Sequence, residues 1–307
     1  MPRRDDDEFD DDDRPRRRPR DDDDDDRPSR SRRSRDDDDF DSPPKKKSNI
    51  ALILVIVLVV LFVLCGGAIF GGCYFLKRGV SSVQNAADRM NSSNNLKEIG
   101  LACHLYADKY DDIPNNSYDA NGKPLLSWRV HILPFLGEQG LYNQFNLNEP
   151  WDSATNKRLL SQMPRVYATP SEQMGRTPKG TTTYYRGFSN PGTLFAKRGN
   201  GAPPVGKAGN NPPGGGPRLT FMNITDGMSN TILAVEAGDP VEWTKPDDLD
   251  ASPGKPFPKL GGIRPAEDTV LVLFADGTVT PIKRSNSEIL WRGATTYAGN
   301  EIGMLDR

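Results

Sequence analysis

Histidine and cysteine are the residue types best suited to nucleophilic and metal chemistry, and this chain has few of them. Its 307 residues include two histidines, His104 and His131, and three cysteines. Cys103 directly precedes His104, but neighbouring residues of a helix point about 100° apart and do not face each other. We therefore expect a core or boundary pair in place of an activated thiolate, and a packed His131 among apolar neighbours.

Two cysteines, Cys65 and Cys73, lie in a long apolar run, which leaves one for the rest of the chain. One cysteine can form neither an intrachain disulfide nor a cysteine-based zinc site. The sequence also contains no Gly-x-Ser-x-Gly elbow, His-Glu-x-x-His motif, P-loop or dinucleotide fingerprint. An enzyme would need Asp226, Glu236 or Asp276 to converge with a histidine in a cleft. We predict no catalytic residue, no cofactor and no enzymatic activity.

Carboxylates gather at two places where calcium could bind through oxygen ligands. Glu236, Asp239 and Glu242 follow a predicted strand, and a second group lies within Asp108–Asp112 after a predicted helix. Neither group has the spacing of an EF-hand loop, and surface carboxylates are usually solvated. We predict no metal site, with the first three residues as weak calcium candidates.

Aromatic residues offer another route to function, as the walls of a site for a surface glycan or a peptide. The candidates are Trp128, Trp151, Trp243 and the pair Tyr184 and Tyr185. Such residues more often fill a core. A pocket lined by several exposed aromatics would favour a binding module, and burial of all of them would favour a scaffold.

Charge is concentrated in an N-terminal tail of alternating Asp and Arg blocks. Of the 42 acidic and 40 basic residues, 19 and 15 lie within residues 1–47, which leaves 23 and 25 for residues 48–307. The tail has too few apolar residues to offset its chain entropy, so we predict a disordered cytoplasmic segment. It is either a solvated spacer or a partner for anionic lipid, nucleic acid or an acidic protein. The near-neutral remainder predicts no nucleic-acid binding by the globular domain.

The run from Ile50 to Leu76 contains no charged residue. As a helix it would be about 40 Å long, against about 30 Å of membrane hydrocarbon. Lys45–Lys47 and many arginines precede the run, whereas Lys77 and Arg78 alone flank its other end, so the positive-inside rule places the N-terminus in the cytoplasm. We predict one transmembrane helix at 48–76 in the cytoplasmic (inner) membrane. Its Gly67 and Gly71 form a small-xxx-small pair suited to helix–helix contact.

The elements that must position these residues follow from the hydrophobic pattern. Apolar residues at steps of three and four predict a helix over 80–110, with a break at Asn91–Asn95. Strands are predicted at 181–188 and 231–235, and a hairpin joins 270–274 to 278–282 through an Asp-Gly turn. Residues 128–133 are a strand or short helix, and 136–145 a short helix. Residues 197–217 are a Gly/Pro-rich loop. We predict an α+β domain, a long N-terminal helix followed by a mainly antiparallel sheet.

Six segments resemble, in order, those of a known family. They are Asn94–Ala102, Ser127–Pro134, Leu141–Asp152, Asp226–Leu233, Val241–Pro246 and Phe274–Gly277. Together they resemble the pilin-like family of domains of unknown function numbered 1559 (DUF1559), abundant in planctomycete bacteria, from about Asn91 to the C-terminus. The resemblance implies a pseudopilin-like plan, with a helix half in the membrane and an exported sheet domain with long loops. It implies no established enzymatic activity.

Two features depart from the usual members of that family. The apolar run lacks the Gly-Phe-Thr-Leu type of prepilin cleavage site, and Arg264–Asp268 replaces a histidine-containing stretch. We therefore expect a permanent tether at 48–76, a membrane-proximal stalk at 77–92 and an exported domain at 93–307. The predicted function is a structural or protein-interaction role in the cell envelope, with the bilayer, envelope proteins or a second copy as partners. The alternative is a glycan- or peptide-binding module.

Overall fold

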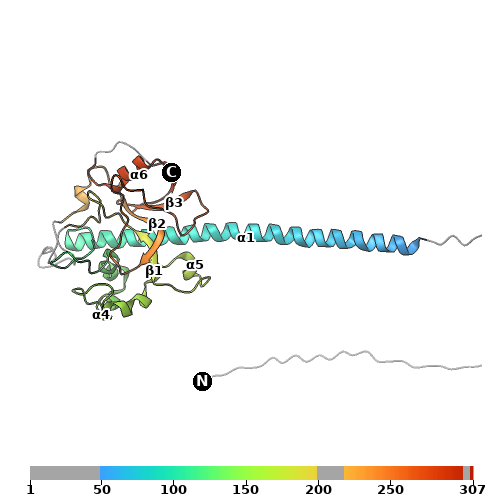
Figure 1. Cartoon of the computed structure of the whole chain (residues 1–307), viewed down its shortest axis with the longest axis horizontal. Coiled ribbons are helices and arrows are strands. Elements are labelled where there is room, and N and C mark those ends of the chain that lie inside the picture. Colours follow the sequence, from blue (N-terminus) through green and yellow to red (C-terminus); the bar gives the residue numbers. More distant parts are fainter. Residues whose placement is uncertain (1–48, 199–217, 300–304, 307) are drawn as a thin grey trace, which may run out of the picture. The chain divides into compact units, whose positions relative to one another are not determined.

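The computed structural model describes residues 49–198, 218–299, 305 and 306, without the side chains of residues 64–82. The predicted tail, 1–47, and most of the predicted loop, 197–217, lie outside these residues. The chain divides into two compact units, Met1–Leu64 and Cys65–Arg307. The second unit contains all the strands and short helices described below (Figure 1).

Helix α1 is a single helix of 61 residues, Ile50–Tyr110. No proline interrupts it, and it ends where Asp111 turns into the left-handed region at φ 56° and donates its N–H to the Ala107 carbonyl, 2.8 Å away. The predicted break at Asn91–Asn95 is wrong. Ser92 and Asn95 bond to side chains elsewhere in the fold, so their polar groups do not compete for the helix backbone.

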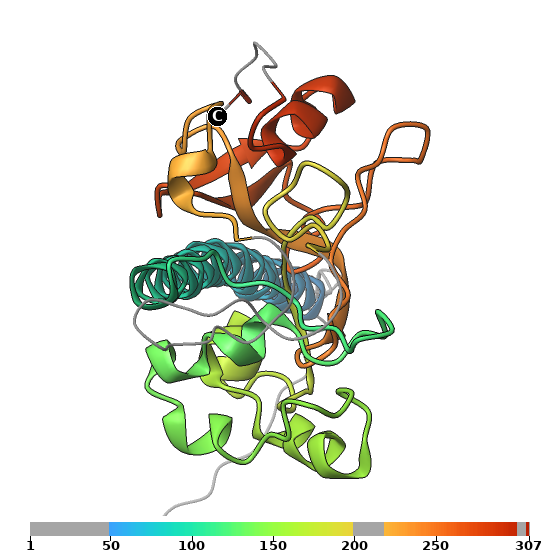
Figure 2. The ribbon, with the colours of Figure 1, turned by 90° about the vertical axis from the view of Figure 1, so that its left-hand side faces the viewer.

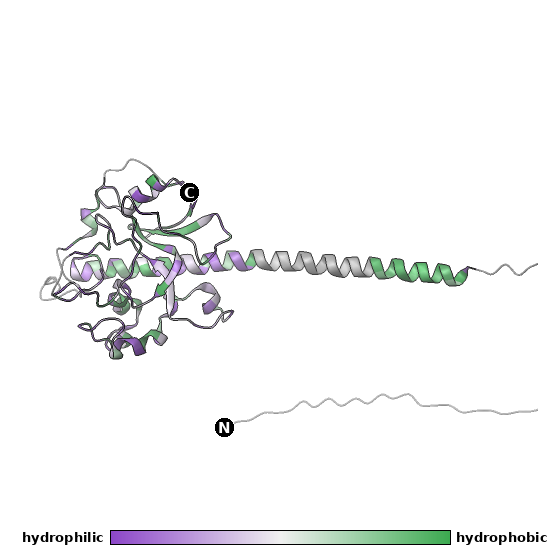
Figure 3. Cartoon of the chain, viewed as in Figure 1, coloured by the Kyte–Doolittle hydropathy of each residue, from purple (hydrophilic) through white to green (hydrophobic). Residues whose placement is uncertain are grey.

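The first turns of α1, residues 50–63, carry only apolar side chains, and its later turns mix apolar and polar ones (Figure 3). Within the part of the chain that the structure describes, no helix is long and apolar enough to cross a membrane. The predicted transmembrane helix at 48–76 is therefore not supported there. The side chains of residues 64–82, a range that includes Gly67 and Gly71, lie outside what the structure describes. The helix–helix contact predicted at these two glycines therefore stays a prediction.

The described residues form a four-stranded antiparallel sheet in the order β1-β2-β3-β4. The strands are β1 (Thr182–Arg186), β2 (Ile232–Glu242), β3 (Thr269–Phe274) and β4 (Val279–Lys283). The predicted hairpin is confirmed as β3 and β4, with Val270 opposite Ile282 and Leu273 opposite Val279. Together with the helices, this sheet confirms the predicted α+β class.

Short helical elements precede the first strand, separate β1 from β2, and follow the last strand. They are α2 (Trp128–His131), η1 (Leu133–Leu136), α3 (Gln139–Tyr142), α4 (Ala154–Lys157), η2 (Arg158–Gln162), η3 (Arg165–Tyr167), α5 (Pro170–Gln173), η5 (Phe221–Asn223) and α6 (Glu288–Thr295). The pattern predicted helical structure around α2 and α3 but not α6. Helix α6 begins at Ser287, whose hydroxyl accepts a hydrogen bond from the Leu290 N–H.

Two apolar clusters lie on the two faces of the sheet. Side chains of β3 alternate between them, because successive residues of a strand point to opposite faces. Leu271 and Leu273 join the cluster that contains Leu96, Ile99 and Tyr106 of α1. Val270 and Val272 join the cluster that contains Trp291 of α6. The later turns of α1 thus lie between the sheet on one side and the short helices α2 to α5 on the other, and α6 lies on the far face of the sheet (Figure 2).

Candidate functional site

The histidines and the cysteine of the domain occupy core and boundary positions. Cys103 is fully buried, and its burial raises the pKa of the thiol. His131 is 1% exposed, and burial lowers its pKa to about 3, so its ring is neutral. Neither His131 nitrogen has a hydrogen-bond partner among the described residues. His104 stacks on Phe221, with ring centroids 4.2 Å apart. These positions suit packing in the core and at its boundary.

The three carboxylates that an enzyme would need, Asp226, Glu236 and Asp276, each bond to a group other than a catalytic partner. Asp226 accepts a hydrogen bond from the Gly299 N–H at 2.7 Å, and Asp276 accepts one from the Thr278 N–H at 2.8 Å inside the β3–β4 turn. Glu236 is paired with Arg264. Both ring nitrogens of His131 and Nε2 of His104 lack a hydrogen-bond partner among the described residues, so none of these atoms is bonded to a carboxylate there. The absence of enzymatic activity nevertheless stays a prediction.

The calcium candidates do not form a cation site. The Glu236 carboxylate is buried and accepts two hydrogen bonds from Arg264, at 2.7 and 2.8 Å, while Asp239 is exposed to solvent. In the second group, Asp112 pairs with Arg198, and Asp111 lies 3.9 Å from Arg218. Across the residues described, no group of three or more His, Cys, Asp or Glu side chains could hold a metal ion.

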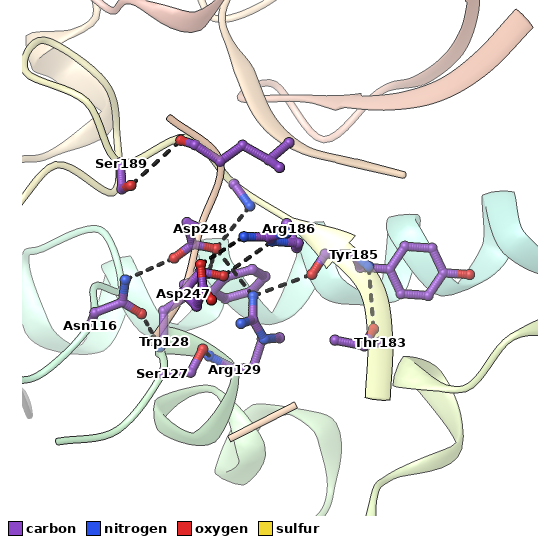
Figure 4. A network of polar contacts seen from close by, with 12 residues as sticks. Asn116, Ser127, Trp128, Arg129, Thr183, Tyr185, Arg186, Ser189, Asp247 and Asp248 are labelled. Atoms are coloured by element: carbon purple, nitrogen blue, oxygen red, sulfur yellow. Dashed lines mark hydrogen bonds and ion pairs between the residues drawn. The ribbon is translucent and has the colours of Figure 1, made fainter. Parts of the chain in front are cut away.

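A fully buried ion pair between Arg129 and Asp248 ties four segments together (Figure 4). The two charged atoms, Arg129 Nη1 and Asp248 Oδ1, lie 3.2 Å apart. Arg129 also donates to the carbonyl oxygens of Tyr185, Trp243 and Lys245. Asp248 accepts hydrogen bonds from the Asn116 amide, the Trp128 indole and the Gly187 N–H, at 2.7, 3.1 and 3.1 Å.

The charge of Arg129 and the hydrogen bonds of this network favour the ionised form of the Asp248 carboxyl group. Burial alone would raise the pKa of the carboxyl group. The Arg129 charge and the three hydrogen-bond donors outweigh burial and hold the pKa of Asp248 below its ordinary value. An ion pair without access to water cannot act on a ligand. The network therefore fixes the positions of α2, β1 and the segment after β2, and it is structural.

A second buried cluster attaches α1 to the sheet. Ser92 of α1 donates to the Glu236 carboxylate of β2, and its hydroxyl lies 2.8 Å from the Tyr185 hydroxyl of β1. Asn95, one turn later, donates to the same Tyr185 oxygen at 3.1 Å. Arg264 neutralises Glu236 from the other side. These contacts set which face of α1 turns toward the sheet.

Sequence reasoning did not find either buried pair. Arg129, Asp248 and Arg264 look like ordinary surface charges, because their partners lie far away along the chain. The available signal was the Ser-Trp-Arg segment, which was used for the resemblance alone. Its serine caps α2, while its Trp128 and Arg129 both bond to Asp248.

The aromatic candidates for a ligand site mostly fill the core. Trp128, Trp243 and Tyr185 are fully buried. The Trp243 indole donates to the Leu160 carbonyl at 3.0 Å, and its ring stacks on Tyr167. Trp151 and Tyr184 are half-buried. Burial of three of the five candidates favours the scaffold over the aromatic ligand site.

The opposite face of α1 is exposed, and part of it is apolar. Val83, Met90, Leu101 and Leu105 are 69%, 66%, 61% and 42% exposed. The other exposed positions on this face, such as Asn94 and Lys97, are polar. Helix α1 therefore has one face held by the domain and one face that presents apolar side chains to solvent.

These features define the class of the protein, an α+β domain built around the later turns of a long N-terminal helix. The family model described as "Protein of unknown function (DUF1559)" matches residues 81–300. The chain belongs to this family, which confirms the resemblance. No curated protein and no solved structure matches the chain.

Proposed function

We propose that this protein is a single-pass, membrane-anchored and pilin-like domain with a structural or protein-interaction role in the cell envelope. It has no catalytic role in this proposal. The observation that carries it is the outward face of α1, with Leu101 and Leu105 one turn apart and exposed. The groups best suited to catalysis are, in contrast, buried or bonded to structural partners.

Exposed leucines on a docked helix favour a protein partner. Burial of a leucine side chain against a partner stabilises the contact by about 1.5–3 kcal/mol. Single exposed apolar residues are ordinary, but Val83, Met90, Leu101 and Leu105 recur on one helix face. A partner helix, from an envelope protein or a second copy, would bury them together.

The anchor in this proposal is the run Ile50–Leu76, which holds no charged residue. Its flanking lysines support a cytoplasmic N-terminus and an exported domain in the cytoplasmic membrane. Gly67 and Gly71 would let a second anchor helix approach closely. The pseudopilin-like plan, implied by family resemblance, fits a helix that continues from such an anchor into the domain.

The test is site-specific photo-cross-linking of the full chain in intact cells. A benzophenone amino acid is placed at Leu101, at Leu105 and, as a control, at Ile289 of α6, which is 79% exposed. We expect cross-linked products from the two α1 positions and none from position 289. Equal yields at all three positions, or none at positions 101 and 105, would contradict the interaction role.

Topology is tested separately by protease protection. Added protease should digest the exported domain from the outer side of the membrane and leave the N-terminal tail intact. Digestion of the tail from outside, with residues 79–307 protected, would overturn the proposed orientation. This result would leave the cross-linking test of the helix face unaffected.

A further inference from the structure

A polar cleft lies beside α1 and adjoins a second cleft over α5, and the proposed function uses neither. The first has a volume of about 320 Å³, and α1 contributes Asn91, Asn94, Asn95 and Glu98 to one wall. The second has a volume of about 310 Å³ and lies over α5. Arg165 and Gln173 line both clefts, so the two clefts adjoin, and together they are called the groove. Each volume is at the lower end of the range of about 300–1,000 Å³ for small-molecule sites.

The first cleft holds polar groups whose hydrogen-bonding capacity the protein leaves unused. Asn91, Asn94 and Glu98 make no side-chain hydrogen bond or ion pair with any described residue, and neither does Glu138 on the facing wall. The spacing of the three α1 residues, at steps of three and four, places them on one helix face. Asn91 and Glu138 are half-buried, whereas Asn94 and Glu98 are exposed, so water satisfies these groups when the cleft is empty. A polar ligand that replaces this water finds four groups able to bond to it.

The partly buried amides at this wall are oriented by their own partners. Asn95 donates its Nδ2 to Tyr185 and to the Ala168 carbonyl, and Gln173 donates its Nε2 to the carbonyls of Arg165 and Ala168. These bonds use the amide donors and leave Oδ1 of Asn95 and Oε1 of Gln173 as acceptors. With Glu98 and Glu138 against the one cation Arg165, the first cleft is therefore rich in acceptors and has a net negative charge.

The second cleft has the opposite charge. Arg165 and Lys179 line it, and within the described residues neither has an ion-pair partner. Its one carboxylate, Glu172, is occupied by hydrogen bonds from the N–H groups of Thr169 and Gly180, at 2.7 and 2.8 Å. An incoming carboxylate would find two cations against this single carboxylate, so the second cleft has a net positive charge.

We propose that this groove binds a short peptide with a free ammonium group at one end and a free carboxylate at the other. The ammonium group would lie in the first cleft against Glu98 and Glu138, and the carboxylate in the second against Arg165 and Lys179. Asn91 and Asn94 would bond to the peptide groups between them. A neutral glycan fits less well, because it would leave four charges unpaired and the linings include no aromatic ring on which a sugar could stack.

Calorimetric titration of the purified full-length protein in detergent tests this site. The probes are L-alanine peptides of two to five residues with free ends, together with the same peptides acetylated at the N-terminus or amidated at the C-terminus. At least one free peptide should bind with a Kd below about 1 mM. Blocking either end should weaken that binding about tenfold, since a charge-assisted contact contributes roughly twice a neutral one.

Paired variants assign each end of the peptide to its cleft. Glu98→Gln with Glu138→Gln should weaken binding of the free peptide about tenfold and leave the N-acetylated peptide unaffected. Arg165→Gln with Lys179→Gln should also weaken binding of the free peptide about tenfold and should leave binding of the C-amidated peptide unaffected. The control pair, Asp152→Asn with Lys123→Gln, changes exposed charges outside both linings and should bind like the unaltered protein.

Three results would overturn the proposal. They are no binding of any free peptide at about 10 mM, binding that the two groove variants do not change, and tighter binding of the neutral sugar chitotriose. The peptide site does not depend on the proposed interaction role. Failure of the titration would leave cross-linking at Leu101 and Leu105 unaffected, and the reverse also holds.

Discussion

At the scale of single residues, the pair Arg129 and Asp248 shows how the domain tolerates charge in its interior. Both side chains are fully buried. Removing an ion from water costs several kcal/mol, and a buried pair offsets that cost only when further hydrogen bonds satisfy both partners. Arg129 makes three such bonds to carbonyl oxygens, and Asp248 accepts three from an amide, an indole and a peptide N–H. The pair is therefore sensitive to the loss of either member.

Arg129→Met should lower the free energy of unfolding by about 3–5 kcal/mol, because it leaves the Asp248 charge buried without its counter-ion. The matched control is Lys283→Met, which removes an exposed pair with Asp306 and should cost between 0 and about 1 kcal/mol. Urea denaturation followed by tryptophan fluorescence measures both. Equal effects of the two substitutions would contradict the structural role of the buried pair.

Low pH should weaken the same network and so lower the stability of the fold. The pKa of Asp248 in the fold lies below its value in the unfolded chain, about 3.9. Its contribution to stability is therefore fully present above about pH 4 and is lost as the pH falls through the folded pKa. We expect the free energy of unfolding to fall more steeply between about pH 4 and 2 in the unaltered protein than in Asp248→Asn. Parallel pH profiles would contradict this assignment.

At the scale of elements, the docking of α1 depends on polar contacts as well as on its apolar stripe. Leu96, Ile99 and Tyr106 face the core. Apolar packing tolerates small rotations of a helix, whereas a hydrogen bond does not. The bonds from Ser92 and Asn95 to Tyr185 therefore define the rotation of the later turns of α1 relative to the sheet.

Two adjacent tyrosines of β1 allow a matched test of that attachment. Tyr185→Phe should lower the free energy of unfolding by about 1–2 kcal/mol, because it removes the hydroxyl that bonds to both Ser92 and Asn95 and leaves them only their bonds to Glu236 and the Ala168 carbonyl. Tyr184→Phe, at a half-buried position, should change it by less than about 0.5 kcal/mol. Equilibrium denaturation measures both, and a larger loss for Tyr184→Phe would contradict the arrangement.

Between β2 and β3, the backbone at Gly262 passes close to the backbone at Gly238 of β2, and this contact fixes the position of the segment. Gly262 donates its N–H to the Ala237 carbonyl, and a Cβ at Gly262 would overlap the Gly238 carbonyl oxygen. Gly262→Ala should therefore destabilise the fold by about 1–3 kcal/mol. In the control, Gly140→Ala, the new methyl group on α3 meets no atom within 4 Å, so thermal unfolding should occur near the normal temperature or slightly above it. An unchanged melting temperature for Gly262→Ala would show that the two backbones separate easily.

The elements that the sequence predicted well are those with a strong local signal. The stripe from Leu96 to Tyr106 has helical spacing, and the Asp-Gly turn between β3 and β4 joins two apolar runs. Helix α6 has only eight residues, and its capping serine was not recognised. The pairing of Glu236 with Arg264, and of both with α1, depends on contacts that no local pattern records. For the same reason the groove beside Arg165 was not predicted.

At the scale of the whole molecule, one thiol can report whether the domain is folded. Cys103 is fully buried in the core that joins α1 to the sheet. In a Cys65→Ser, Cys73→Ser variant, Cys103 should react with a maleimide only when the domain unfolds, so the labelling rate and the fluorescence transition should share one midpoint in urea. Rapid labelling without denaturant would show that α1 separates from the sheet in the native state.

The contact between Ser92 and Glu236 also affects how the domain folds during its synthesis. The two residues are 144 positions apart in the chain. At a synthesis rate of about 5–20 residues per second, roughly 7 to 30 seconds pass between the emergence of one and of the other. During that interval Leu96 and Ile99 have no sheet to cover them. We therefore expect a nascent chain halted before β2 to bind chaperones, and release of this binding to coincide with the synthesis of β2 and β3.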